Sequence, residues 1–322
     1  MPLVNYHLPL VASSGQTERA SLDHDFVTVK TFDSREGKVR LVRQKGTDKL
    51  RIIKSVRHDN RQKPPREARG LARLPQLHPN INRLFAAELD FNGNGKMLFE
   101  YCRGGDLLQQ CERFDSMNMN VPPLFALHIW ISVGEALAFL HHGKVHDFGR
   151  NYRRVSGHRE PLVHCDIKED NVFLKWPGQR SGLPDVVLSD FGLSSSHPTP
   201  GNGCVPYFSP ECRANKVRHL TYKTDIYSFG VMMHQILNFR VGFWPPGKNP
   251  DDVNVDKEYK GMGFTYVLRK CLIHKARKRG DFSSTSSPGL LGHLADFREK
   301  RSQMLQDSRQ MIRPEWWNFR NG

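Results

Sequence analysis

The hydrophobic pattern of this 322-residue chain changes character near residue 105. In residues 26–56, apolar and polar residues alternate in three runs, FVTVKTF, KVRLVRQ and KLRIIKSV. Alternation with a period of two predicts half-buried β-strands, and the turn-like QKGTDK between the last two runs predicts an antiparallel meander. After Gly104 and Gly105 the pattern is mostly helical. We therefore predict an α+β, bilobal fold with a small antiparallel sheet and a larger, mainly helical lobe.

The small sheet is expected to carry one helix, because EARGLARLPQL at residues 67–77 has helical spacing. We predict an N-terminal tail over residues 1–24, a small lobe with its hinge over 25–102, a helical lobe over 103–300, and a helix end with a tail over 301–322. Residues 143–163 contain Gly, Arg and His without a sustained period, and they predict an inserted basic surface loop. Trp316 and Trp317 could dock the C-terminal tail onto the body of the protein or onto a partner, and docking on the body is the favoured interpretation.

The apolar run at residues 124–140 is short for a membrane span and carries His128 and Glu135, so we predict a buried core helix and no membrane span. The first 15 residues lack the basic segment of a signal peptide. Six cysteines without a CxxC pair indicate reduced thiols in an intracellular protein, cytoplasmic or nuclear. The formal net charge of +15 favours acidic partners, nucleic acid among them. Because the basic residues are scattered over most of the chain, a solvated basic surface is the favoured interpretation.

The segment LVHCDIKEDNVFL, residues 162–174, places Asp166, Lys168 and Asn171 in one loop with the spacing D-x-K-x-x-N. Phosphoryl transfer to a hydroxyl needs a carboxylate that accepts the proton, a cation near the γ-phosphate, and ligands for magnesium. These three residues supply those groups. The segment resembles the catalytic loop of eukaryotic-type protein kinases, and Lys168 is typical of the serine/threonine class. The resemblance implies ATP and Mg²⁺ as cofactors and a protein as substrate.

Two Asp-Phe-Gly triplets, beginning at Asp147 and Asp190, each look like the kinase signature that brings a carboxylate to magnesium. The second triplet follows Asp166 by 24 residues (190 minus 166), and the β-like VVLS stands immediately before it. A kinase requires this strand context. The first triplet lies in the predicted inserted loop, upstream of the catalytic loop and with no predicted strand before it. We therefore predict Asp190 as the magnesium ligand and no metal-binding role for Asp147.

Two further segments extend the resemblance towards the C-terminus. GCVPYFSPE, residues 203–211, has the spacing of the kinase pattern G-T-x-x-Y-x-A-P-E, and CLIHKARKRG resembles a later kinase segment. The resemblance implies an ion pair between Glu211 and Arg279. TDIYSFGVMMHQIL resembles the central helix of the large lobe, in which Asp225 would brace the backbone of the catalytic loop. EYCRGGDL and the SPE ending faintly resemble the NIMA-related group of kinases.

The resemblance also assigns residues to the nucleotide site. Lys54 in KLRIIKSV would contact the α- and β-phosphates, and Glu67 would be its ion-pair partner. The backbones of Glu100 and Cys102 would hold the adenine edge. The remaining positions assigned to the nucleotide are Gly37, Val39, Ile52, Asp106 and Phe173. Asp106 and Asp170 also occupy positions where related kinases recognise basic residues upstream of the target serine or threonine.

Several positions depart from the kinase pattern. In FDSREGKV, Phe32 and Ser34 stand where the glycine-rich loop has its first two glycines, and side chains there should hold the loop away from phosphate. Ile52 and Phe173 are larger than the residues that usually enclose adenine. These departures motivate an alternative, a pseudokinase-type binding scaffold with weak or no catalysis. A nucleic-acid-associated protein on a kinase scaffold is a third hypothesis. The presence of Lys54 and of all the catalytic-loop residues favours catalysis.

Two cysteines replace residues with defined kinase roles. Cys165 stands where many kinases have an arginine that binds a phosphate of the activation segment, and a thiol cannot form those charge-assisted bonds. We therefore predict activity that does not depend on phosphorylation there. Cys204 replaces the threonine whose hydroxyl bridges Asp166 and Lys168, which weakens or removes that bridge.

Overall fold

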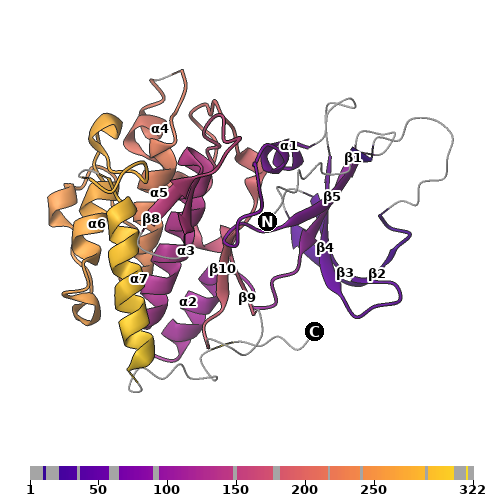
Figure 1. Ribbon diagram of the computed structural model, residues 1–322, viewed down its shortest axis with the longest axis horizontal. Helices are drawn as coiled ribbons and strands as arrows, with labels where there is room; N and C mark the ends of the chain where they lie inside the picture. The colour runs from indigo at the N-terminus through magenta and orange to yellow at the C-terminus, as the bar shows by residue number, and fades with distance from the viewer. Residues whose placement is uncertain are drawn as a thin grey trace. The chain divides into compact units, whose positions relative to one another are not determined.

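The computed structural model describes residues 10–11, 22–34, 37–57, 65–89, 94–147, 151–176, 182–216, 218–239, 242–286, 289–307 and 317. The chain divides into two compact units, Met1–Cys102 and Arg103–Gly322 (Figure 1). The first unit is built on a sheet and the second is mainly helical, which confirms the predicted α+β class.

The first unit contains a six-stranded sheet and the helix α1 (Arg66–Ala72). In spatial order its strands are β1 (Leu10–Val11), β5 (Leu84–Leu89), β6 (Asn94–Glu100), β4 (Leu50–Arg57), β3 (Gly37–Gln44) and β2 (Phe26–Ser34). The neighbours from β5 to β2 pair antiparallel, as the alternating pattern predicts, and β1 pairs parallel with β5.

The predicted N-terminal tail over residues 1–24 is wrong where the structure describes it. Leu10 and Val11 form β1. The backbone amide of Leu22 donates a hydrogen bond of 2.8 Å to the Glu88 carboxylate on β5, and Asp23 forms an ion pair of 2.7 Å with Lys96 on β6. A two-residue strand is too short to show a period, and its partner is distant in sequence, so the pattern could not reveal this pairing.

The pleat of β4 decides which of its side chains meet α1. Ile52 and Val56 pack against the cluster that contains Ala68 of α1, whereas Ile53 belongs to a separate cluster with Val42. Successive side chains of a strand point to opposite faces, so Lys54 shares the face of Ile52 and Val56. The alternation that predicts the strand thereby also directs Lys54 towards α1.

The second unit is organised around α3 (Pro123–His142). Its other α-helices, in chain order, are α2 (Leu107–Ser116), α4 (Pro210–Ala214), α5 (Lys223–Leu237), α6 (Phe264–Cys271) and α7 (Leu291–Gln306). Helix α3 packs against α5 and α7. Trp130 of α3 contacts the rings of Phe229, Phe264 and Phe297. By length and composition α3 could cross a membrane, but 89% of its apolar window is buried within the protein. This burial confirms the predicted core helix.

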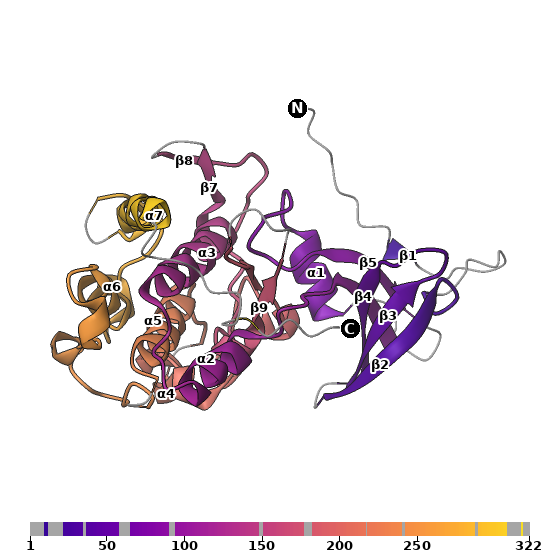
Figure 2. The same ribbon diagram turned by 90° about the horizontal axis from the view of Figure 1, so that it is seen from below.

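Two short hairpins complete the second unit. One pairs β9 (Val172–Lys175) with β10 (Asp185–Leu188), and the other pairs β7 (Lys144–Asp147) with β8 (Asn151–Arg154). Figure 2 shows β7 and β8 extending from the end of α3. The predicted loop at 143–163, and the prediction that no strand precedes Asp147, are therefore wrong. Strands of four residues are too short for alternation to distinguish them from a loop.

Candidate active site

The backbone of the catalytic loop is held by one buried carboxylate. Asp225, at the start of α5, accepts hydrogen bonds from the backbone amides of His164 at 2.7 Å and Cys165 at 2.9 Å. His141 of α3 donates to the same carboxylate from Nε2 at 2.9 Å. Cys165 has a φ of 70°, a left-handed conformation that is unfavourable for a residue with a side chain. The contacts of Asp225 confirm its predicted bracing role and hold this strained turn in place.

Asp166, Lys168 and Asn171 come together as the sequence predicts. The Asn171 side-chain nitrogen donates to the Asp166 carboxylate and to the Asp166 carbonyl, both at 2.8 Å. Lys168 Nζ lies 3.5 Å from the Asp166 carboxylate and 3.4 Å from that of Asp170. Burial lowers the pKa of Lys168, but these two carboxylates raise it above its ordinary value, so the ammonium stays charged. Burial raises the pKa of the Cys204 thiol, which is therefore neutral near pH 7.

The second Asp-Phe-Gly triplet follows β10, and Asn171 immediately precedes β9. The Ser189 amide donates to the Asn171 carbonyl at 2.9 Å, so the residue before Asp190 is bonded directly to a catalytic-loop residue. Asp190 has a left-handed φ of 60°, and its carboxylate accepts a 3.4 Å hydrogen bond from the Gly192 amide. Asp147, by contrast, ends β7 in the hairpin that packs on α3.

His164 and Phe191 attach the triplet to the catalytic loop. His164 Nε2 donates to the Ser189 carbonyl at 2.9 Å, and its Nδ1 accepts from the Asp166 amide at 3.2 Å. The imidazole lies 4.7 Å from the ring of Phe191, with 64° between the ring planes. Both side chains are fully buried. This packing fixes the backbone on either side of Asp190.

Lys54 and Glu67 form the ion pair that the resemblance implies. Lys54 Nζ lies 3.1 Å from Glu67 Oε2, and only 12% of the lysine side chain and 4% of the glutamate side chain is exposed. The pair joins β4 to the first turn of α1. Because desolvated charges are costly when one partner is missing, this pair constrains the position of α1 relative to the strand.

The other predicted nucleotide residues of the first unit lie on neighbouring strands. Val39 on β3 pairs with Lys54, and Ile52 pairs with the buried Phe99 on β6. Gly37 begins β3 opposite Ser34. The Glu100 amide donates to the Arg83 carbonyl at 2.9 Å, and the side chain of Cys102 is buried. The middle of the predicted glycine-rich loop, residues 35 and 36, lies outside the described residues.

Asp106 and Phe173 belong to the second unit and adjoin each other through an isolated β-bridge. The Asp106 carboxylate accepts from the Gln109 amide at 2.9 Å and caps α2, and burial raises its pKa. Gly104 lies against β9, where a Cβ at this position would stand 2.6 Å from the Leu174 Cβ. Only glycine allows the segment before α2 to approach β9 so closely.

The catalytic loop also contains a buried acid, Glu169, for which the sequence motifs predict no role. Its side chain is fully buried and accepts a short hydrogen bond from the Tyr207 hydroxyl. Burial raises the pKa of Glu169 to about 7. The sequence signal for this burial is the run of charged residues in KEDN. Lys168 and Asp170 both reach solvent, so the side chain of the residue between them points inwards.

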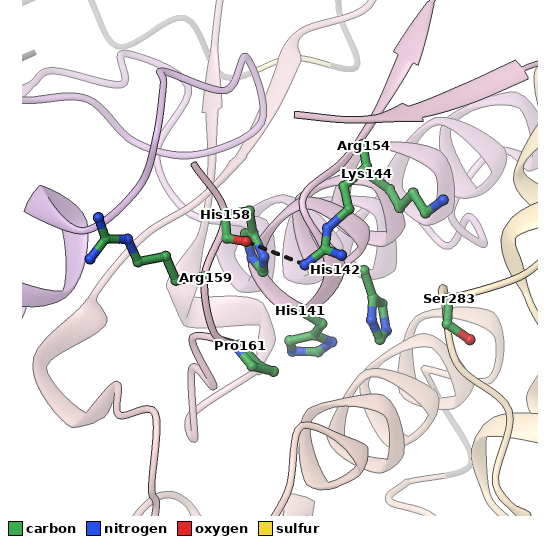
Figure 3. A pocket seen from close by; sticks show the side chains of 8 residues that line it. All are labelled: His141, His142, Lys144, Arg154, His158, Arg159, Pro161 and Ser283. Carbon is green, nitrogen blue, oxygen red and sulfur yellow. Dashed lines mark hydrogen bonds between the residues drawn. The ribbon is translucent and has the colours of Figure 1, made fainter. Parts of the chain in front are cut away.

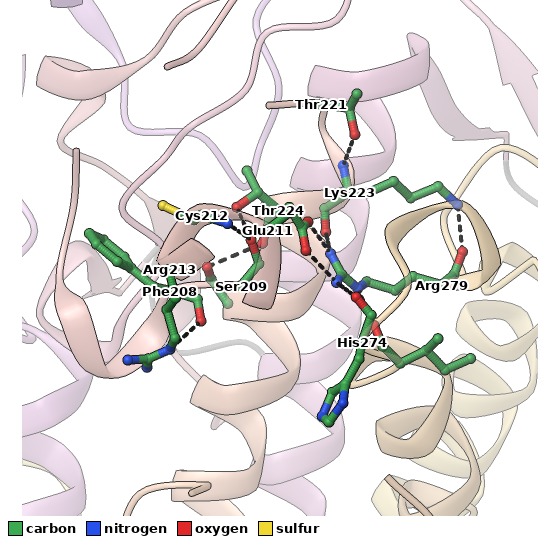
Figure 4. A network of polar contacts seen from close by, with 12 residues as sticks. Phe208, Ser209, Glu211, Cys212, Arg213, Thr221, Lys223, Thr224, His274 and Arg279 are labelled. Carbon is green, nitrogen blue, oxygen red and sulfur yellow. Dashed lines mark hydrogen bonds and ion pairs between the residues drawn. The ribbon is translucent and has the colours of Figure 1, made fainter. Parts of the chain in front are cut away.

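Glu211 and Arg279 form the predicted ion pair. Arg279 donates two parallel hydrogen bonds to the Glu211 carboxylate, at 2.7 Å and 2.9 Å (Figure 4). Its guanidinium also donates to the carbonyls of Lys223, Ile273 and His274. Arg279 is fully buried, and these contacts satisfy it. The pair lowers the pKa of Glu211 even though burial opposes the charge.

Comparison with known proteins places these features in a family. Residues 35–287 match the model of the protein kinase domain. The serine/threonine-protein kinase Nek5 of Mus musculus is 28% identical over 211 residues, which are 64% of this chain and 30% of that protein. The wall-associated receptor kinase-like 14 of Arabidopsis thaliana is 28% identical over 59% of this chain and 24% of its own length. The U-box domain-containing protein 33 of Arabidopsis thaliana is 33% identical over 51% of this chain and 17% of its own length.

The chain thus spans less than a third of the length of these relatives. The matched residues include Lys54, the catalytic loop, the second Asp-Phe-Gly triplet and the Glu211–Arg279 pair. No narrower kinase group is distinguished by these similarities, so the faint resemblance to the NIMA-related group stays a prediction. This chain belongs to the protein kinase domain family.

Proposed function

We propose that this chain is a protein serine/threonine kinase, which transfers the γ-phosphoryl group of ATP to a hydroxyl of a protein. The observation that carries the proposal is the side-chain amide of Asn171, which is bonded to the Asp166 carboxylate at 2.8 Å while Lys168 lies 3.5 Å from the same carboxylate. A carboxylate, a cation and an amide are thus assembled in one braced loop. These are the protein groups that phosphoryl transfer to a hydroxyl requires.

Asp166 would orient the attacking hydroxyl and accept its proton. The hydrogen bond from Asn171 fixes the rotamer of the Asp166 carboxylate, so the accepting oxygen is positioned before the substrate arrives. The Lys168 ammonium would stabilise negative charge that develops on the transferred group. Positioning and charge stabilisation supply most of the catalysis in this class of reaction.

Asn171 and Asp190 would hold Mg²⁺, which supplies charge neutralisation on the phosphate oxygens when it is bound. The Asn171 side-chain nitrogen donates to two oxygens of Asp166, which fixes the orientation of the amide. The Oδ1 atom of Asn171 is therefore the atom that would bind a cation. Among the described residues no group of three or more His, Cys, Asp or Glu could hold a metal. Magnesium fits this pattern because it takes one or two protein oxygens and completes its shell with phosphates and water.

Lys54 would contact the α- and β-phosphates of ATP. Its 3.1 Å ion pair with Glu67 supports this role, because the same lysine–glutamate pair must be in place in active protein kinases.

The predicted preference for basic residues upstream of the target rests on Asp106 and Asp170. Asp170 is about half exposed, which suits such a role better than the capping carboxylate of Asp106. A peptide array without enrichment of Arg or Lys upstream of the target would refute this preference.

The two Asp-Phe-Gly triplets provide a matched test of the proposal. We expect the wild-type chain to transfer γ-phosphate to a general protein substrate in the presence of ATP and Mg²⁺. Asp166→Asn should lower kcat by about 10²–10⁴-fold, because it removes the proton acceptor. Asp190→Asn should abolish magnesium-dependent transfer, whereas Asp147→Asn, the same change in the first triplet, should leave the rate unchanged.

Measurement of ATP binding separates this proposal from the alternatives. A wild-type chain that binds Mg·ATP without transferring phosphate would be a nucleotide-binding scaffold, and one that binds no nucleotide would be a scaffold of the pseudokinase type. An Asp147→Asn variant as inactive as Asp190→Asn would contradict the assignment of the second triplet.

A further inference from the structure

A cavity of about 350 Å³ lies at the C-terminal end of α3, and its lining includes no residue of the catalytic-loop segment 162–174. Its walls are formed by eight residues: His141, His142, Lys144, Arg154, His158, Arg159, Pro161 and Ser283 (Figure 3). Six of the eight carry a cationic or imidazole side chain, and none of the eight is acidic. The volume falls within the usual range of sites for small ligands. The proposed kinase mechanism uses none of these residues.

The fold holds the basic walls of the cavity in place. Lys144 of β7 and Arg154 of β8 are directly opposite each other in the hairpin, so their side chains lie on the same face. Arg154 donates a hydrogen bond of 3.3 Å to the His158 carbonyl. Gly143 ends α3 with a left-handed φ of 62°, and a Cβ there would stand 2.6 Å from the Cβ of His158. Glycine is therefore needed for His158 to pack against the helix end.

Three ring nitrogens of these histidines are buried without a hydrogen-bond partner: Nδ1 of His141, Nε2 of His142 and Nδ1 of His158. The other nitrogens of two of the rings are engaged, since His141 Nε2 donates to Asp225 and His158 Nε2 donates to the Leu140 carbonyl. His141 itself is only 1% exposed. Buried polar atoms normally have partners, so three such atoms around one cavity indicate a ligand that would supply them.

We propose that this cavity binds a phosphate-monoester dianion. Lys144, Arg154 and Arg159 supply positive charge, and the imidazoles supply N–H donors once they are protonated. A metal ion is disfavoured, because three cationic side chains line the same space and no metal-binding group occurs among the described residues. A tetrahedral dianion compensates the positive charge of the walls, and it accepts hydrogen bonds from the unpartnered nitrogens when these rings are protonated.

Two buried or part-buried acidic groups near the cavity, Asp225 and Asp281, are already neutralised. Asp225 accepts hydrogen bonds from His141 and from two backbone amides. Asp281 forms an ion pair with Lys223 and accepts from the Ser283 amide at 2.8 Å. Neither carboxylate lines the cavity. The field that an incoming anion meets is therefore set by the cationic walls.

The binding of a dianion should be coupled to proton uptake. Burial, with His141, His158 and Lys223 nearby, lowers the pKa of His142 to about 4, and Asp281 opposes this shift. Burial and Arg154 also lower the pKa of His158. Negative charge in the cavity favours the protonated rings and raises both pKa values. At pH 7.5 a phosphate monoester is already mostly a dianion, so any protons taken up on binding come to the protein.

Isothermal titration calorimetry of the full chain tests the proposal with three probes at pH 7.5: inorganic phosphate, phosphoserine and glucose 6-phosphate. We expect saturable binding, with protons taken up when the titration is compared in two buffers of different ionisation enthalpy. Tighter binding of either ester identifies an ester ligand and distinguishes an amino-acid source from a sugar source. Binding of phosphate alone, or no binding of any probe, would overturn the ester assignment.

Variants of the β7–β8 hairpin locate the binding. Lys144→Gln and Arg154→Gln should each weaken the tightest probe by about tenfold. Arg153→Gln removes the same charge from the neighbouring residue of β8, which does not line the cavity, and should change the affinity less than twofold. Thermal unfolding checks that all three variants are folded. Equal losses in Arg153→Gln and Arg154→Gln, or binding without proton uptake, would contradict the proposal. Because the readout is binding, a chain without kinase activity can still pass this test.

Discussion

Glu169 shows at the scale of one residue how a charged motif can contain a buried acid. It stands between two residues whose side chains reach solvent, and the Tyr207 hydroxyl donates to its carboxylate. Burial raises its pKa from 4.5 to about 7, and the hydrogen bond from Tyr207 only partly offsets this effect. Near neutral pH, the loop that carries Asp166 therefore contains a buried carboxyl group, Glu169, that is close to its titration point.

This raised pKa makes stability depend on pH. Between pH 4.5 and 7 the folded protein keeps a proton that the unfolded chain has lost, so stability falls as the pH rises through this window. The shift corresponds to about 3 kcal/mol. Glu169→Gln keeps an acceptor for Tyr207 and removes the titration. We expect the variant to match the wild type near pH 4.5 and to be more stable at pH 8 in urea unfolding.

The matched control is Asp170→Asn, because Asp170 is adjacent but 48% exposed. This change should leave the slope of stability against pH between 5 and 7 as it is in the wild type. A Glu169→Gln variant with the wild-type slope would show that Glu169 does not titrate in this range.

Cys165 yields a second prediction at the residue scale. Its thiol lies 3.7 Å from the Val163 carbonyl and carries no positive charge that could bind a phosphate. If the chain is a kinase, phosphatase treatment of the purified protein should leave its turnover within about twofold of the untreated rate. Loss of turnover after this treatment would show that phosphorylation controls the site through other residues.

At the scale of elements, Arg279 joins segments that are distant in sequence. Arg279 directly follows the short helical turn η6 (Ala276–Lys278). It contacts Glu211 in α4 and Lys223 in α5. Removing one partner of a buried ion pair leaves an uncompensated charge. We expect Glu211→Ala to lower the free energy of unfolding by about 3–5 kcal/mol in urea titrations.

Arg277→Gln serves as the control for this prediction, since Arg277 lies two residues away and is exposed. Surface substitutions of this kind usually change stability by less than about 0.5 kcal/mol. A Glu211→Ala variant as stable as Arg277→Gln would mean that the pair contributes to local geometry and not to global stability.

At the scale of the whole molecule, Trp317, which is distant in sequence from α2 and α3, packs on the helical unit. Trp317 is buried, and its ring lies 4.9 Å from Phe125, 5.2 Å from Trp176 and 6.2 Å from Phe114. This confirms the predicted docking on the body for Trp317, while Trp316 lies outside the described residues. Ring pairs in edge-to-face geometry add to the stabilisation that comes from the buried area.

Trp317→Ala should therefore destabilise the helical unit by about 3–5 kcal/mol, the usual cost of truncating a buried tryptophan. Differential scanning calorimetry at fixed pH measures the change in Tm. Leu305→Ala in α7 is the control, because Leu305 is 43% exposed and should have a small effect. Equal Tm values for the two variants would show that the tail contributes no net stability.

The sequence by itself determined those elements and site residues whose patterns involve only neighbouring residues. Alternation predicts the strands that carry Val39 and Lys54, and the continuous apolar run predicts the buried helix α3. The spacing D-x-K-x-x-N predicts the cluster of Asp166 and Asn171, since residues five apart in one tight loop can meet without help from distant elements. The order of the motifs, with Asp190 following Asp166, favours the second Asp-Phe-Gly triplet, whereas the strand context does not separate the two triplets, because β7 ends at Asp147.

Only the tertiary structure decided the features whose partners lie far away in the chain. The pairing of β1 with β5 and the ion pair of Asp23 with Lys96 depend on contacts between distant segments. The burial of Glu169 and the gathering of His142 with Arg154 around one cavity depend on them too. The burial and the electrostatic environment of a side chain depend on tertiary packing. The sequence therefore shows which residues are charged, but it does not determine which of them are removed from water.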